Sequence, residues 1–369
     1  MSSKTVGIVV AGSGGSGAMT AGSVLLRGAA LAGYYGQMSR LSGPQVRGGE
    51  AAALLRFALE PVEAQPDRFD VFCGIDWGNV DRFAAEIPLG PESILLFDPR
   101  KGEIPSALTA SKARTVSVSL AEMAGSVRGG RANMVAAGYL AALLKLALDP
   151  MAQAVRDQLS GKGDIAIAAS ENAFRVGYEK GASSGRDYGL GVPAHPSQRW
   201  LLSGNQAAAL GSLRGGIRFV AGYPITPATE LVEWLSPALS RLGGQLQQAE
   251  DELASINMAL GASFGGTPAM TVTSGPGLSL MAESIGLAVA AEVPLVVLDV
   301  MRAGPSTGIP TKTEQSDLNL AVHGSHGDAP RVVLSPVSVA DNLETTQWAV
   351  ELAERLQVPA IVLSDQAIG

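Results

Sequence analysis

Short apolar runs alternate with amphipathic segments along the whole chain. In the first half, strand-like apolar runs lie at residues 5–11, 70–73, 93–98 and 114–118, and helical patterns lie at 18–32 and 134–147. In the second half, strands are predicted at 218–221, 270–273 and 295–300, and helices at 207–213, 227–242 and 278–291, with another helix ending at 263. This alternation is typical of α/β domains, each with a mostly parallel sheet covered by helices.

A passage rich in glycine, proline and polar residues, from 181 to 198, interrupts this pattern. The chain has 369 residues, which is too long for one typical hydrophobic core, so two domains are expected. We place the first domain at residues 1–185, a linker at 186–200 and the second domain at 201–369.

Composition and charge exclude several classes of protein. Apolar residues make up 46% of the chain and charged residues 17%, with a net charge of −7, so there is no basic field for nucleic acid or an anionic membrane. The single cysteine, Cys73, excludes a disulfide framework and an iron–sulfur cluster held by this chain alone. The longest apolar run, 285–300, is interrupted by Glu292 and Pro294, which disfavours a membrane span, and no secretion signal is visible. We expect a cytoplasmic protein.

A stiff loop follows the strand predicted at 218–221. It reads Tyr223-Pro224-Ile225-Thr226-Pro227, and because proline pushes the preceding residue out of the helical region, Tyr223 and Thr226 are expected to be extended. Thr226 either caps a helix that begins at Pro227, or its hydroxyl contacts a ligand at the carboxyl end of the strand. The rigidity of the loop favours the ligand contact.

An acidic segment at 250–252 precedes the helix that ends at Ser263. Carboxylates in a first helical turn ordinarily complement the helix dipole, and this role stays open for Glu250 and Glu252. At helical spacing, however, Glu252 lines up with Ile256 and Ala259, so we expect it to be buried, with a raised pKa. A carboxyl group of this kind can share a proton with a ligand nitrogen.

Two further strand ends carry polar loops. After the strand at 270–273, Ser274 and Gly275 can present a hydroxyl and N–H groups at a helix start. Arg302 directly follows the next strand, where its planar fork can bind a carboxylate, and Thr311 and Lys312 can hold a second acidic group. The alternative is that these side chains bind backbone carbonyls or water in a long surface loop.

A glycine loop at residues 12–17 connects the first strand to the first helix. The N–H groups of Gly14 and Gly15 can form an anion site there, and Arg47, between glycine pairs, can reach a phosphate or carboxylate. A dinucleotide-binding site has an acidic residue about 20 positions after the glycine loop, and this chain lacks one there. Glycines that only allow a tight turn, and a solvated Arg47, remain equally open.

Several segments together resemble a known family. Residues 222–230, 250–252, 273–277 and 302–317 resemble the α subunit of 2-oxoacid:ferredoxin oxidoreductases, in the branch that includes 2-oxoglutarate synthase. The first half, with residues 12–17, 47–50 and 131–134, is similar to the γ subunit of the same enzymes, here fused ahead of α. The resemblance implies that the second domain is the pyrimidine-binding domain of a thiamine diphosphate enzyme.

The resemblance also implies roles for individual residues. Glu252 would hydrogen-bond N1′ of the aminopyrimidine and promote the imino tautomer that deprotonates thiazolium C2, with Glu250 as the alternative. Arg302 would bind the 2-oxoacid carboxylate, and Thr311 and Lys312 the far end of the substrate. The implied cofactor-binding residues of the second domain are Tyr223, Pro224, Ile225, Thr226, Glu252, Ser274 and Gly275, with Thr226 also contacting the substrate. In the first domain, coenzyme A is the implied ligand of Gly14, Gly15 and Arg47.

The implied reaction is oxidative decarboxylation of 2-oxoglutarate with coenzyme A to succinyl-coenzyme A, with electrons passed to ferredoxin. The chain lacks the Gly-Asp-Gly…Asn pattern that holds the diphosphate and its metal, and it lacks cluster cysteines. The diphosphate-binding domain, Mg²⁺ and the iron–sulfur cluster are therefore expected on a separate β subunit, in an (αβ)2 assembly. Relatives in this family continue into a further α/β domain beyond the position of Gly369, so we expect either that the sequence is truncated there or that this domain is missing. The alternatives are an enzyme for pyruvate or several 2-oxoacids, or a non-catalytic assembly subunit.

Overall fold

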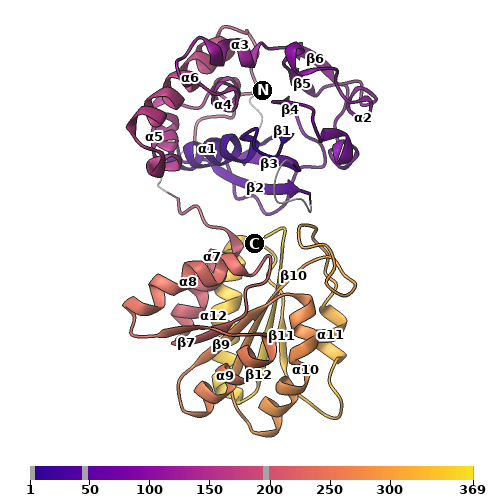
Figure 1. Cartoon of the computed structure of the whole chain (residues 1–369), viewed down its shortest axis with the longest axis vertical. Helices are drawn as coiled ribbons and strands as arrows, with labels where there is room; N and C mark the ends of the chain where they lie inside the picture. The colour runs from indigo at the N-terminus through magenta and orange to yellow at the C-terminus, as the bar shows by residue number, and fades with distance from the viewer. Residues whose placement is uncertain (1–4, 44–48, 194–198, 369) are drawn as a thin grey trace. The chain divides into compact units, whose positions relative to one another are not determined.

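The computed structural model describes residues 5–43, 49–193 and 199–368. The chain divides into two compact units, Met1–Leu201 and Leu202–Gly369, and each contains its own six-stranded sheet. Figure 1 shows the strands and helices of both units, most of them labelled. Each unit is described on its own.

The first unit has a mostly parallel sheet, with the strands in the order β2-β3-β1-β4-β5-β6. Its strands are β1 (Thr5–Ser13), β2 (Tyr35–Ser42), β3 (Glu50–Ala58), β4 (Val71–Gly74), β5 (Ile94–Phe97) and β6 (Arg114–Ser117). β3 runs antiparallel to β1 and β2, and the remaining pairs are parallel. Strands β2 and β3 were not predicted, because β3 is rich in alanine and leucine, which favour helices, and is buried on both faces.

Helices cover the sheet of the first unit. They are α1 (Ala18–Leu31), α2 (Ser106–Thr109), α3 (Leu120–Gly125), α4 (Ala132–Leu143), α5 (Leu148–Gln158) and α6 (Asp164–Ala182). Short 3₁₀ helices lie at Val80–Arg82, Ala84–Glu86, Pro99–Lys101 and Ser160–Lys162. The larger core packs α1 and α3 to α6 against one face, and a smaller core packs α2 and the first two 3₁₀ helices against the other.

The second unit has a wholly parallel sheet, in the order β11-β12-β10-β9-β7-β8. Its strands are β7 (Phe219–Gly222), β8 (Gln245–Gln248), β9 (Ala269–Thr273), β10 (Leu295–Met301), β11 (Val332–Leu334) and β12 (Pro359–Asp365). The predicted α/β fold with mostly parallel sheets is therefore confirmed. β8 was not predicted, because this short edge strand is polar.

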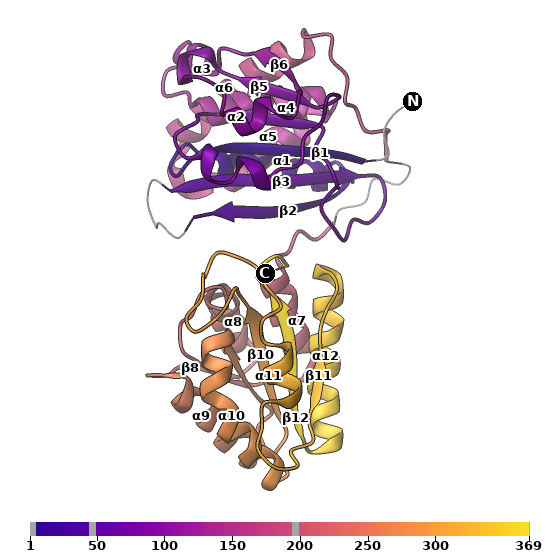
Figure 2. The same cartoon turned by 90° about the vertical axis from the view of Figure 1, so that its right-hand side faces the viewer.

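Helices lie on both faces of the second sheet (Figure 2). They are α7 (Gly204–Gly215), α8 (Thr229–Arg241), α9 (Glu252–Phe264), α10 (Gly275–Ala290), α11 (Leu318–His323) and α12 (Val339–Leu356). One core packs α7, α8 and α12 against the sheet, and the other packs α9, α10 and α11. No helix in the described part of the chain is long and apolar enough to cross a bilayer.

The predicted start of α8 at Pro227, with Thr226 as its cap, is wrong. The helix begins at Thr229, and its N-cap position, Ala228, makes no side-chain cap. The N–H of Thr229 donates to the carbonyl of Ile225 at 3.0 Å, and the Thr226–Pro227 peptide bond is cis. The backbone itself therefore satisfies the first helical N–H group, and the hydroxyl of Thr226 is not used for it.

Part of the predicted linker packs against the first unit. The N–H of Tyr188 donates to the carbonyl of Leu143 at 3.0 Å, and Leu190 is 5% exposed and belongs to the larger core. Lys145 and Asp187 form an ion pair beside them. Residues 187–190 are therefore held by an apolar contact and a charge pair, although their composition is typical of a loop.

Candidate active site

The ends of three neighbouring strands form the candidate site in the second unit. β7 pairs with β9, and β9 pairs with β10, all in parallel, so their carboxyl ends meet at one edge of the sheet. α9 and α10 begin at this edge, and the loop after β10 runs from residue 302 to 317. This is the edge at which α/β sheets bind ligands.

Glu252 is a buried carboxylate at this edge. It is 8% exposed and lies on the buried face of α9 with Ile256 and Ala259, so its predicted burial is confirmed. Its carboxylate accepts no hydrogen bond from the described residues of the chain. Glu250, the alternative for its role, is exposed. Burial therefore favours Glu252 as the carboxylate that faces a ligand.

Glycines in the first turn of α10 make room for the acidic side chains. A Cβ atom at Gly277 would lie 2.0 Å from Thr273 Oγ1 and 2.7 Å from Glu252 Cγ. A Cβ atom at Gly275 would lie 2.8 Å from Asp317 Oδ1. Side chains larger than hydrogen at these positions would displace the carboxylates.

Arg302 connects two loops of the site. Its Nη1 donates to the carbonyl of Thr226 at 2.5 Å and its Nη2 to the carbonyl of Thr307 at 2.6 Å. Arg302 is 7% exposed, and burial lowers its pKa, whereas the negative charges of Asp317 and Glu252 raise it. In the structure, the guanidinium of Arg302 therefore binds backbone carbonyls, as the alternative interpretation of this loop predicts. That a substrate carboxylate binds there stays a prediction.

The loop after β7 turns its hydroxyl-bearing residues outward. Thr226 is exposed and Tyr223 is 40% exposed, while Ile225 packs against the core. Asn205 of α7 donates to the carbonyl of Pro227 at 3.1 Å and so fixes the far end of the loop. Thr226 and Tyr223 are accessible to a ligand, and Pro224 between them is exposed.

The loop after β10 folds back on itself. Ala303 pairs with Ile309 in a bridge and donates to the carbonyl of Lys312 at 2.8 Å. The hydroxyl of Thr311 is buried without a hydrogen-bond partner in the described structure, and Lys312 is half-buried. That Thr311 and Lys312 bind the far end of a substrate stays a prediction.

Buried polar atoms without hydrogen-bond partners gather at this edge. Among the described residues they are Ser274 Oγ, Asp299 Oδ1 and Oδ2, Arg302 Nε, Thr311 Oγ1 and Asp317 Oδ2. Such atoms are rare in proteins, and each one costs about 1–3 kcal/mol unless a ligand, water or proton satisfies it. Their clustering makes this edge the candidate binding site.

Sequence reasoning missed Asp299 and Asp317. Asp299 lies inside the otherwise apolar strand β10 and is completely buried, and Asp317 directly precedes α11 and is 7% exposed. A lone aspartate within a run of valine and leucine was the available signal, because a buried charge needs a partner.

Some backbone N–H groups of the glycine loop in the first unit already donate hydrogen bonds within the protein. Asp76 accepts from the N–H of Ser13 at 2.8 Å, and the N–H of Gly14 donates to the carbonyl of Gly49 at 2.6 Å. Gly15 has a φ of +98°, which the turn requires. The N–H of Gly14 is thus already bound, and Asp76 places a negative charge beside the predicted anion site. Arg47 lies outside the described residues.

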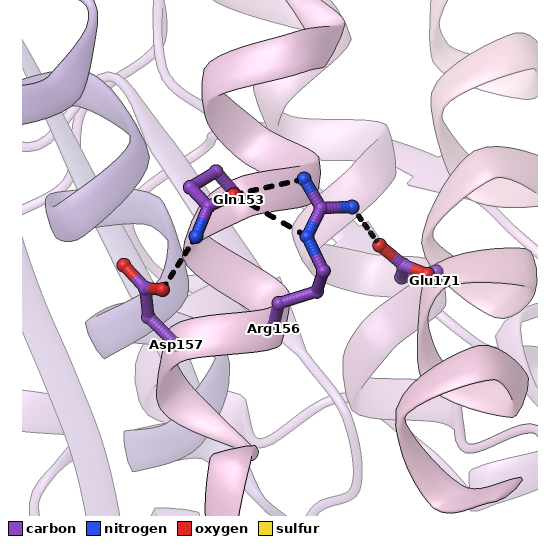
Figure 3. A network of polar contacts seen from close by, with 4 residues as sticks. All are labelled: Gln153, Arg156, Asp157 and Glu171. Carbon is purple, nitrogen blue, oxygen red and sulfur yellow. Dashed lines mark hydrogen bonds and ion pairs between the residues drawn. The ribbon is translucent and has the colours of Figure 1, made fainter. Parts of the chain in front are cut away.

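A polar groove of about 310 Å³ lies between α5 and α6 of the first unit. Figure 3 shows Arg156 between Gln153 and Glu171, with Asp157 bonded to Gln153. Arg156 and Glu171 form an ion pair, and Asp149 and Arg175 also line the groove. No group of three or more potential metal-ligating side chains occurs in the described ranges.

Family models match both units. The model described as pyruvate flavodoxin/ferredoxin oxidoreductase, thiamine diphosphate-binding, matches residues 210–369. The model described as pyruvate ferredoxin/flavodoxin oxidoreductase matches residues 7–180. The candidate site at the strand ends lies within the first of these segments.

Similar proteins carry related names. The 2-oxoglutarate synthase subunit KorA of Archaeoglobus fulgidus is 51% identical over 169 residues, which are 46% of this chain and 49% of that protein. The 2-oxoglutarate oxidoreductase subunit KorA of Mycobacterium tuberculosis is 41% identical over 247 residues, 64% of this chain and 37% of that protein. The alignments of the chain span about half the length of the archaeal KorA relatives it matches, between 46% and 49%.

A solved structure resembles nearly the whole chain. It is the 2-oxoglutarate:ferredoxin oxidoreductase from Magnetococcus marinus with 2-oxoglutarate, coenzyme A and succinyl-CoA bound. The TM-score is 0.90 at 37% sequence identity, and the match covers 99% of this chain and 64% of the other.

Proposed function

The chain belongs to the 2-oxoacid:ferredoxin oxidoreductase family, and on this premise we propose that it is a fused γ/α subunit of a 2-oxoglutarate:ferredoxin oxidoreductase. With a β subunit, it would convert 2-oxoglutarate and coenzyme A to succinyl-coenzyme A and carbon dioxide, with electrons passed to ferredoxin. The main support is the set of unsatisfied buried groups at one sheet edge, within the segment that matches the thiamine diphosphate-binding model.

The residues of this edge fit the pyrimidine half of thiamine diphosphate. The carboxylate of Glu252 has no hydrogen bond from the described residues, and Gly277 leaves space beside it. Thiamine diphosphate, when bound, supplies a carbon nucleophile and an electron sink for decarboxylation. Glu252 would hold a proton at the aminopyrimidine nitrogen, and the exposed side chains of Tyr223 and Thr226 would line the opposite side.

The substrate would bind through Arg302. Its guanidinium can donate a bidentate pair to a 2-oxoacid carboxylate, and its Nε has no partner among the described residues. Binding would replace the carbonyls of Thr226 and Thr307. Thr311 and Lys312, in the same loop, would hold the second carboxylate of 2-oxoglutarate. Pyruvate lacks this second carboxylate, so activity on pyruvate or on several 2-oxoacids is the alternative.

The diphosphate, Mg²⁺ and the iron–sulfur cluster would be held by the β subunit, in an (αβ)2 assembly. The chain has only one cysteine, whereas an iron–sulfur cluster needs several cysteine ligands. Coenzyme A would bind the first unit near Gly15 and Arg47. The family resemblance supports this proposal. The geometry of the glycine loop does not, because the carboxylate of Asp76 beside it disfavours an anionic ligand. The cytoplasmic location expected from the sequence stays a prediction.

Reconstitution with a β subunit tests the proposed function. The complex is expected to reduce a one-electron acceptor only when 2-oxoglutarate and coenzyme A are both present, and neither subunit alone is expected to do so. A panel of pyruvate and other 2-oxoacids, run at equal concentrations, decides the substrate. Assembly without turnover on any 2-oxoacid would favour the non-catalytic alternative.

A further inference from the structure

Two buried aspartates lie at the sheet edge that carries the proposed substrate site. Asp299 of β10 is 0% exposed and Asp317, before α11, is 7% exposed. Their carboxyl groups lie within hydrogen-bonding range of each other, but neither can donate while both are ionised. Two ionised carboxylates have no donor between them, so this contact requires one of them to be protonated. The pair therefore shares a proton and carries a single negative charge.

The proton belongs on Asp299. Both of its oxygens are buried without another donor in the described part of the chain. Complete burial raises the pKa of Asp299 well above its ordinary value, and the charge of Asp317 and the hydrogen bond to it raise this pKa further. Burial also raises the pKa of Asp317, but the interactions with Asp299 and Ser316 and the charge of Arg302 lower it. Asp317 is thus the member that ionises first.

The negative charge of Asp317 interacts with the guanidinium of Arg302. Its carboxylate lies against Gly275, in the first turn of α10, where the helix dipole favours a negative charge. The other charged groups that act on these side chains are Glu314, whose charge raises the pKa of Asp317, and Glu252, whose charge raises the pKa of Arg302. Ser316 adjoins Asp317 and donates to the carbonyl of Arg302 at 2.8 Å.

We propose that Asp299 and Asp317 are a positioning pair, in which Asp299 keeps the proton and the negative charge of Asp317 competes with a 2-oxoacid carboxylate for Arg302. This inference rests on the proposed function of Arg302 as the carboxylate-binding residue. In this arrangement Asp317 sets substrate affinity, because its negative charge lowers the positive potential that an incoming acid meets at Arg302.

Kinetics of the complex with the β subunit test the pair. Asp317→Asn keeps an acceptor for Asp299 and removes the charge, so KM for 2-oxoglutarate should fall about tenfold, because one nearby buried charge changes the local potential strongly. Asp299→Asn leaves the charge in place and should change KM less. Asp328→Asn removes a charge at an exposed position of the same unit and is the matched control. An unchanged or raised KM in Asp317→Asn would overturn the proposal.

Infrared spectroscopy of the full chain gives a second readout that does not depend on turnover. At neutral pH the wild-type chain should show the stretching band of a protonated carboxyl group, which shifts in D2O and is lost in Asp299→Asn. A spectrum of Asp299→Asn that retains this band would overturn the proposal, including where Asp317→Asn fails to fold. Wild-type complex that turns over no 2-oxoacid, with the band present, would instead count against the proposed function.

Discussion

At the scale of single residues, Gly277 controls how closely α10 approaches Glu252. In Gly277→Ala, a Cβ atom would lie 2.0 Å from Thr273 Oγ1 and 2.7 Å from Glu252 Cγ. We expect a loss of about 1–3 kcal/mol in the free energy of unfolding, with a large loss of turnover, because the carboxylate must move. Gly286→Ala, in the same helix with nothing within 4 Å, is the control and should be about 0.5–1 kcal/mol more stable. Urea unfolding and turnover measure both.

Glu252 and Glu250 can be separated by a matched pair of substitutions. Glu252→Gln removes the buried carboxylate and should lower kcat of the complex by about a hundredfold or more, the usual effect of losing a proton-transferring group. Glu250→Gln changes an exposed residue and should retain nearly full activity. A large loss in Glu250→Gln alone would reverse the assignment.

Sequence reasoning predicted the site better where residue chemistry and position agree. Glu252 was expected to be buried because the small apolar residues at helical spacing define a buried face, and it is. The contacts of Arg302 with Thr226 and Thr307 were predicted only as an alternative, since they depend on how two distant loops meet. Asp299 was missed for the same reason: its partner is eighteen positions away, in a loop whose path the sequence does not reveal.

At the scale of elements, two glycines allow α4 and α6 to pack closely. A Cβ atom at Gly177 would lie 2.0 Å from the carbonyl oxygen of Val135, and one at Gly138 would lie 1.9 Å from that of Phe174. Gly177→Ala should lower the free energy of unfolding by about 1–3 kcal/mol, because two backbones must separate. Gly161→Ala, with nothing within 4 Å, should have little effect. Equal urea midpoints for the two variants would contradict the close packing.

The elements that sequence predicted and those it missed differ in their environment. β9 and β10 are buried apolar runs bounded by turns, so pattern alone identifies them. β8 is polar because it lies at the sheet edge, and β3 has the composition of a helix although it pairs on both sides. Where a strand's identity depends on its neighbours, local composition does not determine it.

At the scale of the whole molecule, the single cysteine reports on the first unit. Burial raises the pKa of Cys73 from an ordinary value of 9.0 to about 12. Above pH 9 the unfolded thiol ionises while the folded thiol does not, so stability present below pH 9 is lost as pH rises towards 12. Relative to Cys73→Ala, the free energy of unfolding should fall by about 1.4 kcal/mol per pH unit in this window. Equal pH dependence of the two proteins in urea would contradict this.

Thiol labelling checks the same burial at neutral pH. A thiol reagent should modify Cys73 only when the first unit opens, so its rate should rise with urea along the unfolding transition. Rapid labelling of the folded chain would show that β4 is accessible.

The bonds of Arg302 to Thr226 and Thr307 also act as a non-covalent crosslink between segments that are far apart in sequence. An acid that occupies the guanidinium would cut both ends of this crosslink in one event. Substrate binding would then release the loop after β7 and the loop after β10 at the same time. The rates of amide hydrogen exchange in these two loops would therefore rise together as 2-oxoacid is added, and they would report substrate binding.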